Sequence, residues 1–454
     1  MGKTLITIHQ PHTRMMRISK CSWSAAIVIS TIVLSPFFSS AQLYFPPSQG
    51  LWQTKSIEEL NWCQDRVDSL YQYLELNQTK SFILLKDGKI VLEKYFNGQD
   101  TSDVWYWASA GKTLTGFLVG LAQEQGFLDI QSPVSSYIGA GWSACDSAAE
   151  SHILVVDQLR MTSGLDDAVS DPYCTLPDCL NCIADPGTRW AYHNGPYTLL
   201  DSVMEVTTGL SLNQFFAQNI ALPCGIIGLF VDIDFNHVFF STARNMAKFG
   251  LLLQASGEWN GNTIMNDQDF FQQMTSPSQS LNPSYGYLTW LNGQSELMLP
   301  TSQFVFPGPM LPHAPSDVFA AMGRDGQFIN VSPSDGLVWI RMGEESDQAP
   351  VPFLLNDSIW MRVQQLECPL EVSDISTGGV QPYPNPAAES LFIQTQPGEQ
   401  VELRDLMGRL MASYTASGHG LEMDVSTFAE GSYYAVVYRS SGTAAHRFIV
   451  QHSR

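Results

Sequence analysis

Ser109 and Lys112 are the residues whose types and spacing best suit covalent chemistry in this 454-residue chain. Three positions apart at the start of a helix, their side chains would lie on one helical face. A serine there also lies near the positive end of the helix dipole, which favours an oxyanion. The lysine could activate the serine if burial lowers the pKa of the lysine amine. The aromatic residues 105–107 could provide the apolar surroundings that exclude water from it. The alternative is a chance Ser-x-x-Lys with a solvated lysine.

A second group of candidate residues surrounds His193. Tyr192 and Asn194 lie two apart in a turn that leads into a helix. The tyrosine could pass a proton between nucleophile and leaving group, and the asparagine could orient a substrate amide and hydrogen-bond Lys112. In an extended turn His193 would face the opposite way, so we expect it to be structural rather than a base. The alternative for Tyr192 is a buried aromatic residue with a satisfied hydroxyl.

The elements that must position these groups follow from hydrophobic periodicity and turn residues. An Asp-Gly turn predicts a hairpin over residues 81–95. Strands are also predicted at 328–332 and 336–342, and helices at 112–126, at 194–209 and from the N-cap Ser211 to about residue 221. Strands at both ends with helices between them predict an α/β (α+β) fold, in which helices cover an antiparallel sheet.

The first residues have the layout of a secretory signal peptide. Residues 1–41 contain four basic and no acidic side chains, an apolar run and a small-residue site that ends at Ala41. We expect cleavage after Ala41 rather than a membrane anchor, because the apolar run is short for a span. No other stretch is apolar enough to predict a transmembrane segment. The expected location is therefore outside the cell or at its surface.

The charge balance excludes some partners. Asp and Glu total 44 against 23 Lys and Arg, and loss of the basic leader changes the net charge from −21 to −25. Such a surface repels phosphate backbones and anionic lipids, so we expect no nucleic acid partner. The 44% hydrophobic content excludes a wholly disordered chain.

The cysteines are expected to form disulfides in an oxidising compartment. Eight cysteines less Cys21 leave seven, so at least one thiol stays unpaired. Cys174 and Cys179 could close a small loop. Two more, at the ends of the central region, could tie those ends together: Cys63 and Cys368. The alternative is a zinc site of Cys174, Cys179 and Cys182 with His193 as the fourth ligand. The full pairing cannot be read from the sequence.

The composition shifts near residue 372 and divides the chain. We predict one catalytic body at residues 42–371, a linker at 372–379 and a small β-sandwich at 380–454. The last part shows short alternating runs that are typical of strands, at residues 390–395, 401–406, 432–438 and 447–450.

Together, the Ser109-x-x-Lys112 and Tyr192-x-Asn194 motifs resemble those of the class C β-lactamase-related serine hydrolases. That family includes penicillin-binding carboxypeptidases, esterases and 6-aminohexanoate-dimer hydrolases. The resemblance extends through residues 153–165, 187–225 and 241–250, and covers about residues 50–365. It implies a β-lactamase/transpeptidase-like fold with an antiparallel sheet flanked by helices. It also implies Ser109 as acylating nucleophile, Lys112 as its base and Tyr192 as proton shuttle.

The third motif of that family lies on an edge strand and departs from the pattern here. Gly323 matches its glycine, so the N–H groups of Ser109 and Arg324 would form the oxyanion hole. The position that usually carries Lys or His is Ala321. In lacking a cation at this position, the sequence resembles the esterase and aminohexanoate-hydrolase branch of the family more closely. Arg324 could replace the charge, or could make a surface salt bridge.

The C-terminal residues resemble the sorting domain of the type IX secretion system. The resemblance rests on residues 383–386, 403–410 and 429–434. Such domains direct export across the outer membrane of Bacteroidetes-type bacteria and are commonly removed there. The expected partner is therefore that secretion machinery. The alternative is a β-sandwich that binds carbohydrate or protein.

The leading functional prediction is an exported serine hydrolase that cleaves an ester or amide through an acyl-enzyme on Ser109. One alternative is a β-lactamase or D-alanyl-D-alanine carboxypeptidase, and another is a non-catalytic binding protein on the same fold. We expect no metal or organic cofactor. The substrate depends on loops such as residues 166–185 and 297–315, and neither it nor the oligomeric state can be read from the sequence.

Overall fold

The structure of the protein is a computed structural model that describes residues 43–48, 50–344, 351–368, 381–439 and 442–452. The expected signal peptide and the expected linker at 372–379 lie outside these residues. Within the described part of the chain, no helix is both long enough and apolar enough to cross a bilayer.

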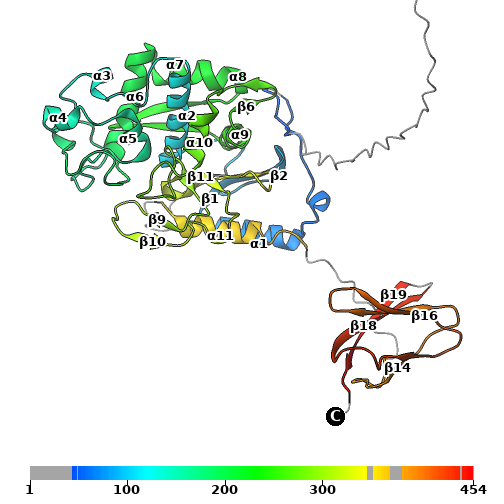
Figure 1. The fold of residues 1–454 in the computed structure, drawn as a ribbon. Coiled ribbons are helices and arrows are strands. Elements are labelled where there is room, and N and C mark those ends of the chain that lie inside the picture. Colours follow the sequence, from blue (N-terminus) through cyan, green and yellow to red (C-terminus); the bar gives the residue numbers. More distant parts are fainter. Residues whose placement is uncertain (1–42, 49, 345–350, 369–380, 440–441, 453–454) are drawn as a thin grey trace, which may run out of the picture. The chain divides into compact units, whose positions relative to one another are not determined.

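The body is built on a six-stranded antiparallel sheet in the order β2-β1-β13-β12-β11-β8 (Figure 1). The predicted hairpin and the predicted strand pair near residue 330 are both confirmed. The strands are β1 (Thr79–Lys86), β2 (Lys89–Tyr95), β8 (Trp290–Leu291), β11 (Phe319–Gly323), β12 (Gln327–Ser332) and β13 (Leu337–Gly343).

Helices cover both faces of this sheet. The α1 helix (Gln64–Leu76) and the α11 helix (Phe353–Val363) lie together on one side, and α9 (Ala243–Gln254) packs on the other (Figure 1). The α2 helix (Gly111–Glu124) is buried from Gly111 to Ala122, as expected for a helix surrounded by other elements. The predicted fold class is therefore confirmed.

The other helices connect the strands or pack around α2. Helix α6 follows the Tyr192 turn as predicted, and the side chain of Ser211 caps α7 by accepting from the N–H of Gln214. These helices are α3 (Ser135–Ile138), α4 (Ser147–Glu150), α5 (Val155–Arg160), α6 (Asn194–Thr208), α7 (Leu212–Phe216), α8 (Leu222–Cys224) and α10 (Gln268–Thr275). Single turns are η1 (Glu58–Leu60), η2 (Ala108–Ala110), η3 (Pro177–Cys179), η4 (Ala217–Ala221) and η5 (Arg324–Gly326).

A smaller antiparallel sheet in the order β3-β5-β4 lies next to the start of α2. Its strands are β3 (Val104–Tyr106), β5 (Asn236–Thr242) and β4 (Gly228–Ile233). Phe230 and Phe239 point to its inner side and are buried against Phe216 of α7. Two short hairpins complete the body, formed by β6 (Glu258–Trp259) with β7 (Asn262–Thr263) and by β9 (Glu296–Met298) with β10 (Val305–Pro307).

The C-terminal strands form two sheets around an apolar core of their own. The four runs predicted as strands are confirmed, and two further strands, β16 and β17, were not predicted. One sheet has the order β16 (Leu410–Thr415), β15 (Gln400–Asp405), β18 (Gly431–Arg439), β19 (Gly442–Val450), and the other pairs β14 (Ser390–Ile393) with β17 (Leu421–Asp424).

Three disulfides are present among the described residues. They include both predicted pairs, Cys63–Cys368 and Cys174–Cys179, and a third, Cys145–Cys182. The thiol expected to remain unpaired is the buried Cys224. The zinc alternative is wrong for these cysteines, because the sulfur atoms that would have ligated the metal are joined in disulfides.

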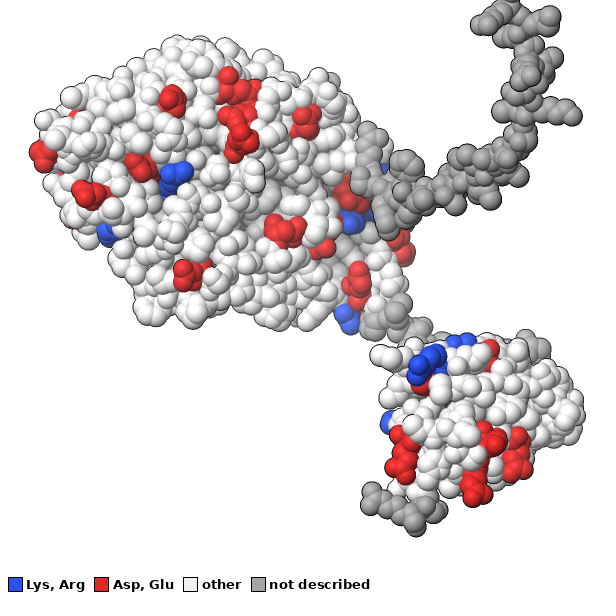
Figure 2. Space-filling view, viewed as in Figure 1, with Lys and Arg blue, Asp and Glu red and all other residues white. Residues whose placement is uncertain are grey.

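Charged side chains are sparse on the surface. In the view of Figure 2, red acidic side chains are scattered over the body and few blue ones accompany them. This agrees with the excess of 44 acidic over 23 basic residues in the sequence.

Candidate active site

Ser109 lies in the single turn η2, directly before α2 begins at Gly111. Ala108 has a φ of 46°, a left-handed conformation that costs an alanine about 1 kcal/mol or more. The chain thus makes a strained turn from β3 into α2, and the serine is placed where the N-terminal dipole of the buried helix acts.

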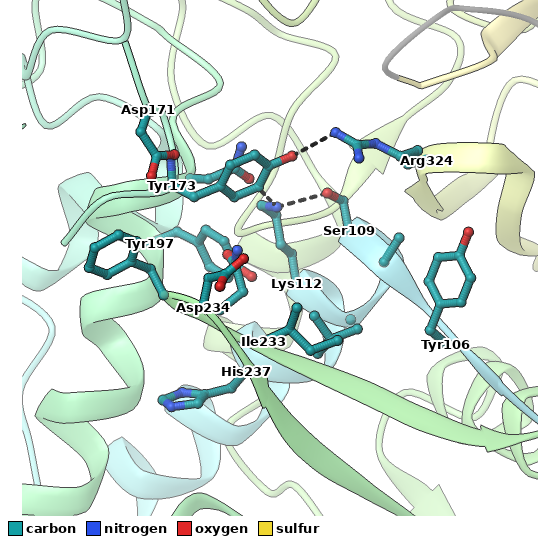
Figure 3. A pocket seen from close by; sticks show the side chains of 16 residues that line it. Tyr106, Ser109, Lys112, Asp171, Tyr173, Tyr197, Ile233, Asp234, His237 and Arg324 are labelled. Carbon is teal, nitrogen blue, oxygen red and sulfur yellow. Dashed lines mark hydrogen bonds between the residues drawn. The ribbon is translucent and has the colours of Figure 1, made fainter. Parts of the chain in front are cut away.

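The amine of Lys112 contacts both Ser109 and Asn194. Figure 3 shows its contact with Ser109. Its Nζ atom is 2.9 Å from Ser109 Oγ and 2.7 Å from Asn194 Oδ1, and the residue is only 2% exposed. Burial lowers the pKa of the amine well below its ordinary value, against the opposing effect of the Asp201 carboxylate. An unprotonated amine beside a hydroxyl group can accept its proton.

The apolar surroundings of the Lys112 amine are tyrosine rings rather than the expected residues 105–107. The Nζ atom lies 4.0 Å from the ring centre of Tyr197 and 4.9 Å from that of Tyr192. Trp107 is fully buried, but its ring packs on Phe239 of the smaller sheet. The sequence indicated aromatic surroundings, but strand alternation turns the tryptophan side chain into the core instead.

Tyr192 is packed among aromatic rings. It stacks on Trp290 with ring centres 5.6 Å apart and is 9% exposed. Burial raises the pKa of its hydroxyl, and the nearby Ser109 hydroxyl opposes that rise. Among the described residues this hydroxyl has no hydrogen-bond partner of good geometry. It is therefore a buried proton donor close to Ser109 and free to bond a reacting group.

The α6 helix brings two residues to the site that sequence reasoning missed. Tyr197 and Asp201 follow Asn194 at spacings of three and seven, so all three lie on one helical face. Asp201 is 2% exposed, and its Oδ2 atom lies 2.9 Å from Nδ1 of His237 on β5. Burial raises the pKa of Asp201, while the bond to Asp201 raises that of His237. The helical spacing after Asn194 was a signal that could have revealed this pair.

Gly323, at the end of β11, packs directly against the turn that carries Ser109. A Cβ atom at this position would lie 2.9 Å from Ser109 N and 2.7 Å from Trp107 O. Only glycine allows such a close approach, because those neighbours are backbone atoms. Arg324 follows and reaches over the site, where its Nη2 atom donates to Tyr173 Oη at 3.1 Å (Figure 3). Ala321, which was predicted from the sequence to hold the Lys/His position of the third motif, is buried in β11.

These groups open onto a cavity of about 480 Å³ (Figure 3). Ser109, Lys112, Asn194 and Arg324 line it, whereas Tyr192 is not among its lining residues. Of the two loops expected to shape the pocket, the first contributes Asp171 and Tyr173 and the second contributes no lining residue. The tip of the β4–β5 hairpin, residues 233–238, forms a wall that the sequence did not predict.

His193 does not line the cavity, in agreement with the expectation that it faces away. Burial lowers the pKa of its imidazole to about 4, and neither ring nitrogen has a hydrogen-bond partner among the described residues. The geometry thus places His193 in the protein interior rather than at the reacting centre.

The sheet-and-helix architecture and the arrangement of the two motifs define a β-lactamase/transpeptidase-like fold. The chain belongs to the beta-lactamase family, whose model matches residues 80–344, more than half of the chain. A second model, that of the secretion system C-terminal sorting domain, matches residues 381–451. The latter match indicates type IX secretion to the cell surface or the medium. No curated protein matches the chain significantly.

Two solved structures illustrate the fold similarity. One, described as a 6-aminohexanoate-dimer hydrolase from Bacillus anthracis, is 20% identical with a TM-score of 0.53; the match covers 72% of this chain and 91% of that chain. Another, described as a beta-lactamase from Bacteroides dorei, is 16% identical with a TM-score of 0.53, covering 67% and 99%. At such identities the similarity establishes the fold alone.

Proposed function

We propose that this protein is an exported serine hydrolase that cleaves an ester or amide bond through an acyl-enzyme on Ser109. The observation that carries the proposal is the position of Lys112. Its buried amine, with a lowered pKa, lies 2.9 Å from Ser109 Oγ and is oriented by Asn194. A non-catalytic binding protein would have no use for a buried lysine held against a serine.

In the proposed reaction, Lys112 accepts the Ser109 proton while Oγ attacks the substrate carbonyl. The proton then passes through Lys112 and Tyr192 to the leaving oxygen or nitrogen, which departs and leaves an acyl-serine. Water later attacks the carbonyl of the acyl-serine and gives a proton to the same groups, which return a proton to Ser109 Oγ as the carboxylic acid is released. Each group therefore serves first as base and then as acid.

The developing negative charge requires donors, and we assign these to two backbone N–H groups. One belongs to Ser109, and the other to Arg324 after Gly323. The close packing of Gly323 on Ser109 N, 2.9 Å from a hypothetical Cβ atom, supports this assignment because it brings the end of β11 to the serine.

A fluorophosphonate probe tests the nucleophile. We expect the wild type and the Ser147→Ala control, which changes an exposed serine of α4, to be labelled equally. The Ser109→Ala variant should lose labelling and turnover. Equal labelling of Ser109→Ala and wild type would refute the proposed nucleophile.

The reaction class can be tested with a panel of p-nitrophenyl esters, aminohexanoate oligomers and nitrocefin. We expect ester or amide turnover, because Ala321 leaves the carboxylate-binding position of β-lactam-cleaving relatives without its cation. Turnover of nitrocefin alone would favour the β-lactamase or carboxypeptidase alternative and would overturn this preference.

The sorting role of the C-terminal residues is tested by deleting residues 380–454. We expect the shortened protein to stay inside the cell envelope, since the matched sorting domain is absent. Fractionation and immunoblotting measure its location, and unchanged export would contradict that role.

A further inference from the structure

The smaller β3-β5-β4 sheet carries large apolar side chains on both sides. On its inner side, Phe230 and Phe239 are buried against the body. The alternate residues point outward, and antiparallel sheets usually carry polar residues on such a face. We call this outer side the apolar sheet face. Its polar residues are Asn236 and Thr242, which pair with Ile233 and Val104. Its apolar residues are Val104, Tyr106, Leu229, Val231, Ile233, Val238 and Phe240.

The register of the sheet makes this face continuous. Leu229 and Tyr106 both pair with Phe240, and Val231 pairs with Val238. Directly paired residues of an antiparallel sheet lie on the same side, with Cβ atoms about 5 Å apart. The face is open, because Leu229 is 51% exposed, Ile233 44% and Val231 36%.

The apolar sheet face borders the cavity that contains Ser109, because Tyr106 of β3, Val238 of β5 and Ile233 of β4 line that cavity. Tyr106 and Ile233 are labelled in Figure 3. The hydroxyl of Tyr106 donates to Asp325, which links the face to the end of β11. The distance from Ile233 out to Leu229 is about 14 Å along the strand. The face is therefore an extension of the cavity wall rather than an isolated surface patch.

We propose that the apolar sheet face binds a long apolar chain of the substrate, attached to the carbonyl group that Ser109 attacks. This inference rests on the proposed hydrolase function and narrows its substrate class to esters or amides of medium- and long-chain acids. An exposed face of this kind marks a binding site. The acidic chain, with a net charge of −21, disfavours an anionic lipid surface as its occupant.

The test compares p-nitrophenyl octanoate with p-nitrophenyl butyrate below their aggregation limits. A fully buried methylene strengthens binding up to about fourfold, so partial burial of four methylenes predicts a kcat/KM ratio of about ten in the wild type. The double variant Leu229→Thr, Val231→Thr should reduce this ratio to about one. Threonine preserves strand propensity, and a general loss of activity cancels in the ratio.

A matched control replaces exposed apolar residues on other elements, Leu76→Thr and Val206→Thr, which are 72% and 61% exposed. It should retain the wild-type ratio. Loss of the ratio in the control, or its retention in the double variant, would overturn the inference. If kcat/KM does not change with the length of the acyl chain, the inference is also overturned. This holds whether or not light scattering shows a dimer in which a second copy covers the face. Ser109-dependent labelling by fluorophosphonate separates that result from failure of the hydrolase proposal itself.

Discussion

Two basic residues, Lys112 and Arg324, line the cavity and differ in their burial and in their contacts. Lys112 is 2% exposed, enclosed by tyrosine rings and held by two short contacts. Arg324 is exposed, and the contact that the structure shows for its guanidinium is a single bond to Tyr173. Burial disfavours a charged amine, whereas an exposed guanidinium keeps its charge. The comparison indicates that burial suits the lysine amine to act as a base, whereas the exposed guanidinium is suited to attracting an anion.

The largest effect is expected when the buried Lys112 is replaced. Replacing Lys112 by methionine removes the proton acceptor beside Ser109, so we expect kcat/KM for an activated ester to fall about a thousandfold. The matched control is Lys248→Met, because Lys248 is also buried and burial lowers its pKa, yet its amine bonds to Gly225 O at 2.7 Å. Equal losses in both variants would show that the effect is structural.

A smaller effect is expected from the carboxylate that acts on Lys112. The charge of Asp201 raises the pKa of Lys112 against the stronger effect of burial. Activity needs the unprotonated amine, so it is lost as pH falls through the lowered pKa. In Asp201→Asn that pKa falls further, and the acid limb of the kcat/KM profile should shift to lower pH by about one unit or less.

The charged neighbours of Asp201 define the control for this shift. His237 bonds to Asp201, and Asp232 and Glu205 act on His237 in turn. Glu205→Gln changes a charge on the same helix that acts on Asp201 but not on Lys112 directly, so its profile should shift less than that of Asp201→Asn. An unchanged profile in Asp201→Asn would mean that this carboxyl is already protonated in the active enzyme.

The smallest effect is expected at the exposed cation. Arg324→Ala keeps the backbone N–H that we assign to the oxyanion hole, so kcat should change little. KM should rise less than about tenfold, and only for substrates that carry a carboxylate. Steady-state kinetics with a neutral ester and its carboxylate analogue measure this difference. A large fall in kcat for both substrates would show that Arg324 takes part in catalysis as Lys112 does, and would contradict the difference in role between the two residues.

The fold was largely readable from the sequence, because its signals are local. The Asp87-Gly88 turn, the Ser211 cap and the apolar stripe of α2 each act within a few residues, and the structure has the predicted elements there. The pairing of β3 with β5 was missed, since β3 has only three residues and β5 lies more than a hundred residues away, whereas the missed β4–β5 hairpin is local. Long-range pairing like that of β3 with β5 leaves little trace in the local pattern.

The site was predicted in part, for the same reason. The two motifs named Ser109, Lys112, Tyr192 and Asn194, and the structure brings these residues together. Their catalytic roles stay predictions. The helical spacing after Asn194 could have revealed Asp201, but the hairpin wall at residues 233–238 and its contact with Asp201 could not be inferred, because they depend on tertiary packing. The apolar substrate chain that this wall would contact could therefore not be predicted from the sequence either.

The Cys63–Cys368 disulfide turns nearly the whole body into a covalent ring, since it joins positions 305 residues apart. The matched sorting domain begins at residue 381, outside this ring, so its removal need not open the ring. A protease that nicks one loop inside the ring opens it without releasing a fragment. On a denaturing gel, a nicked enzyme would therefore migrate as one molecule without reductant and as two fragments with it. Outside the cell, the disulfide would hold the two fragments together.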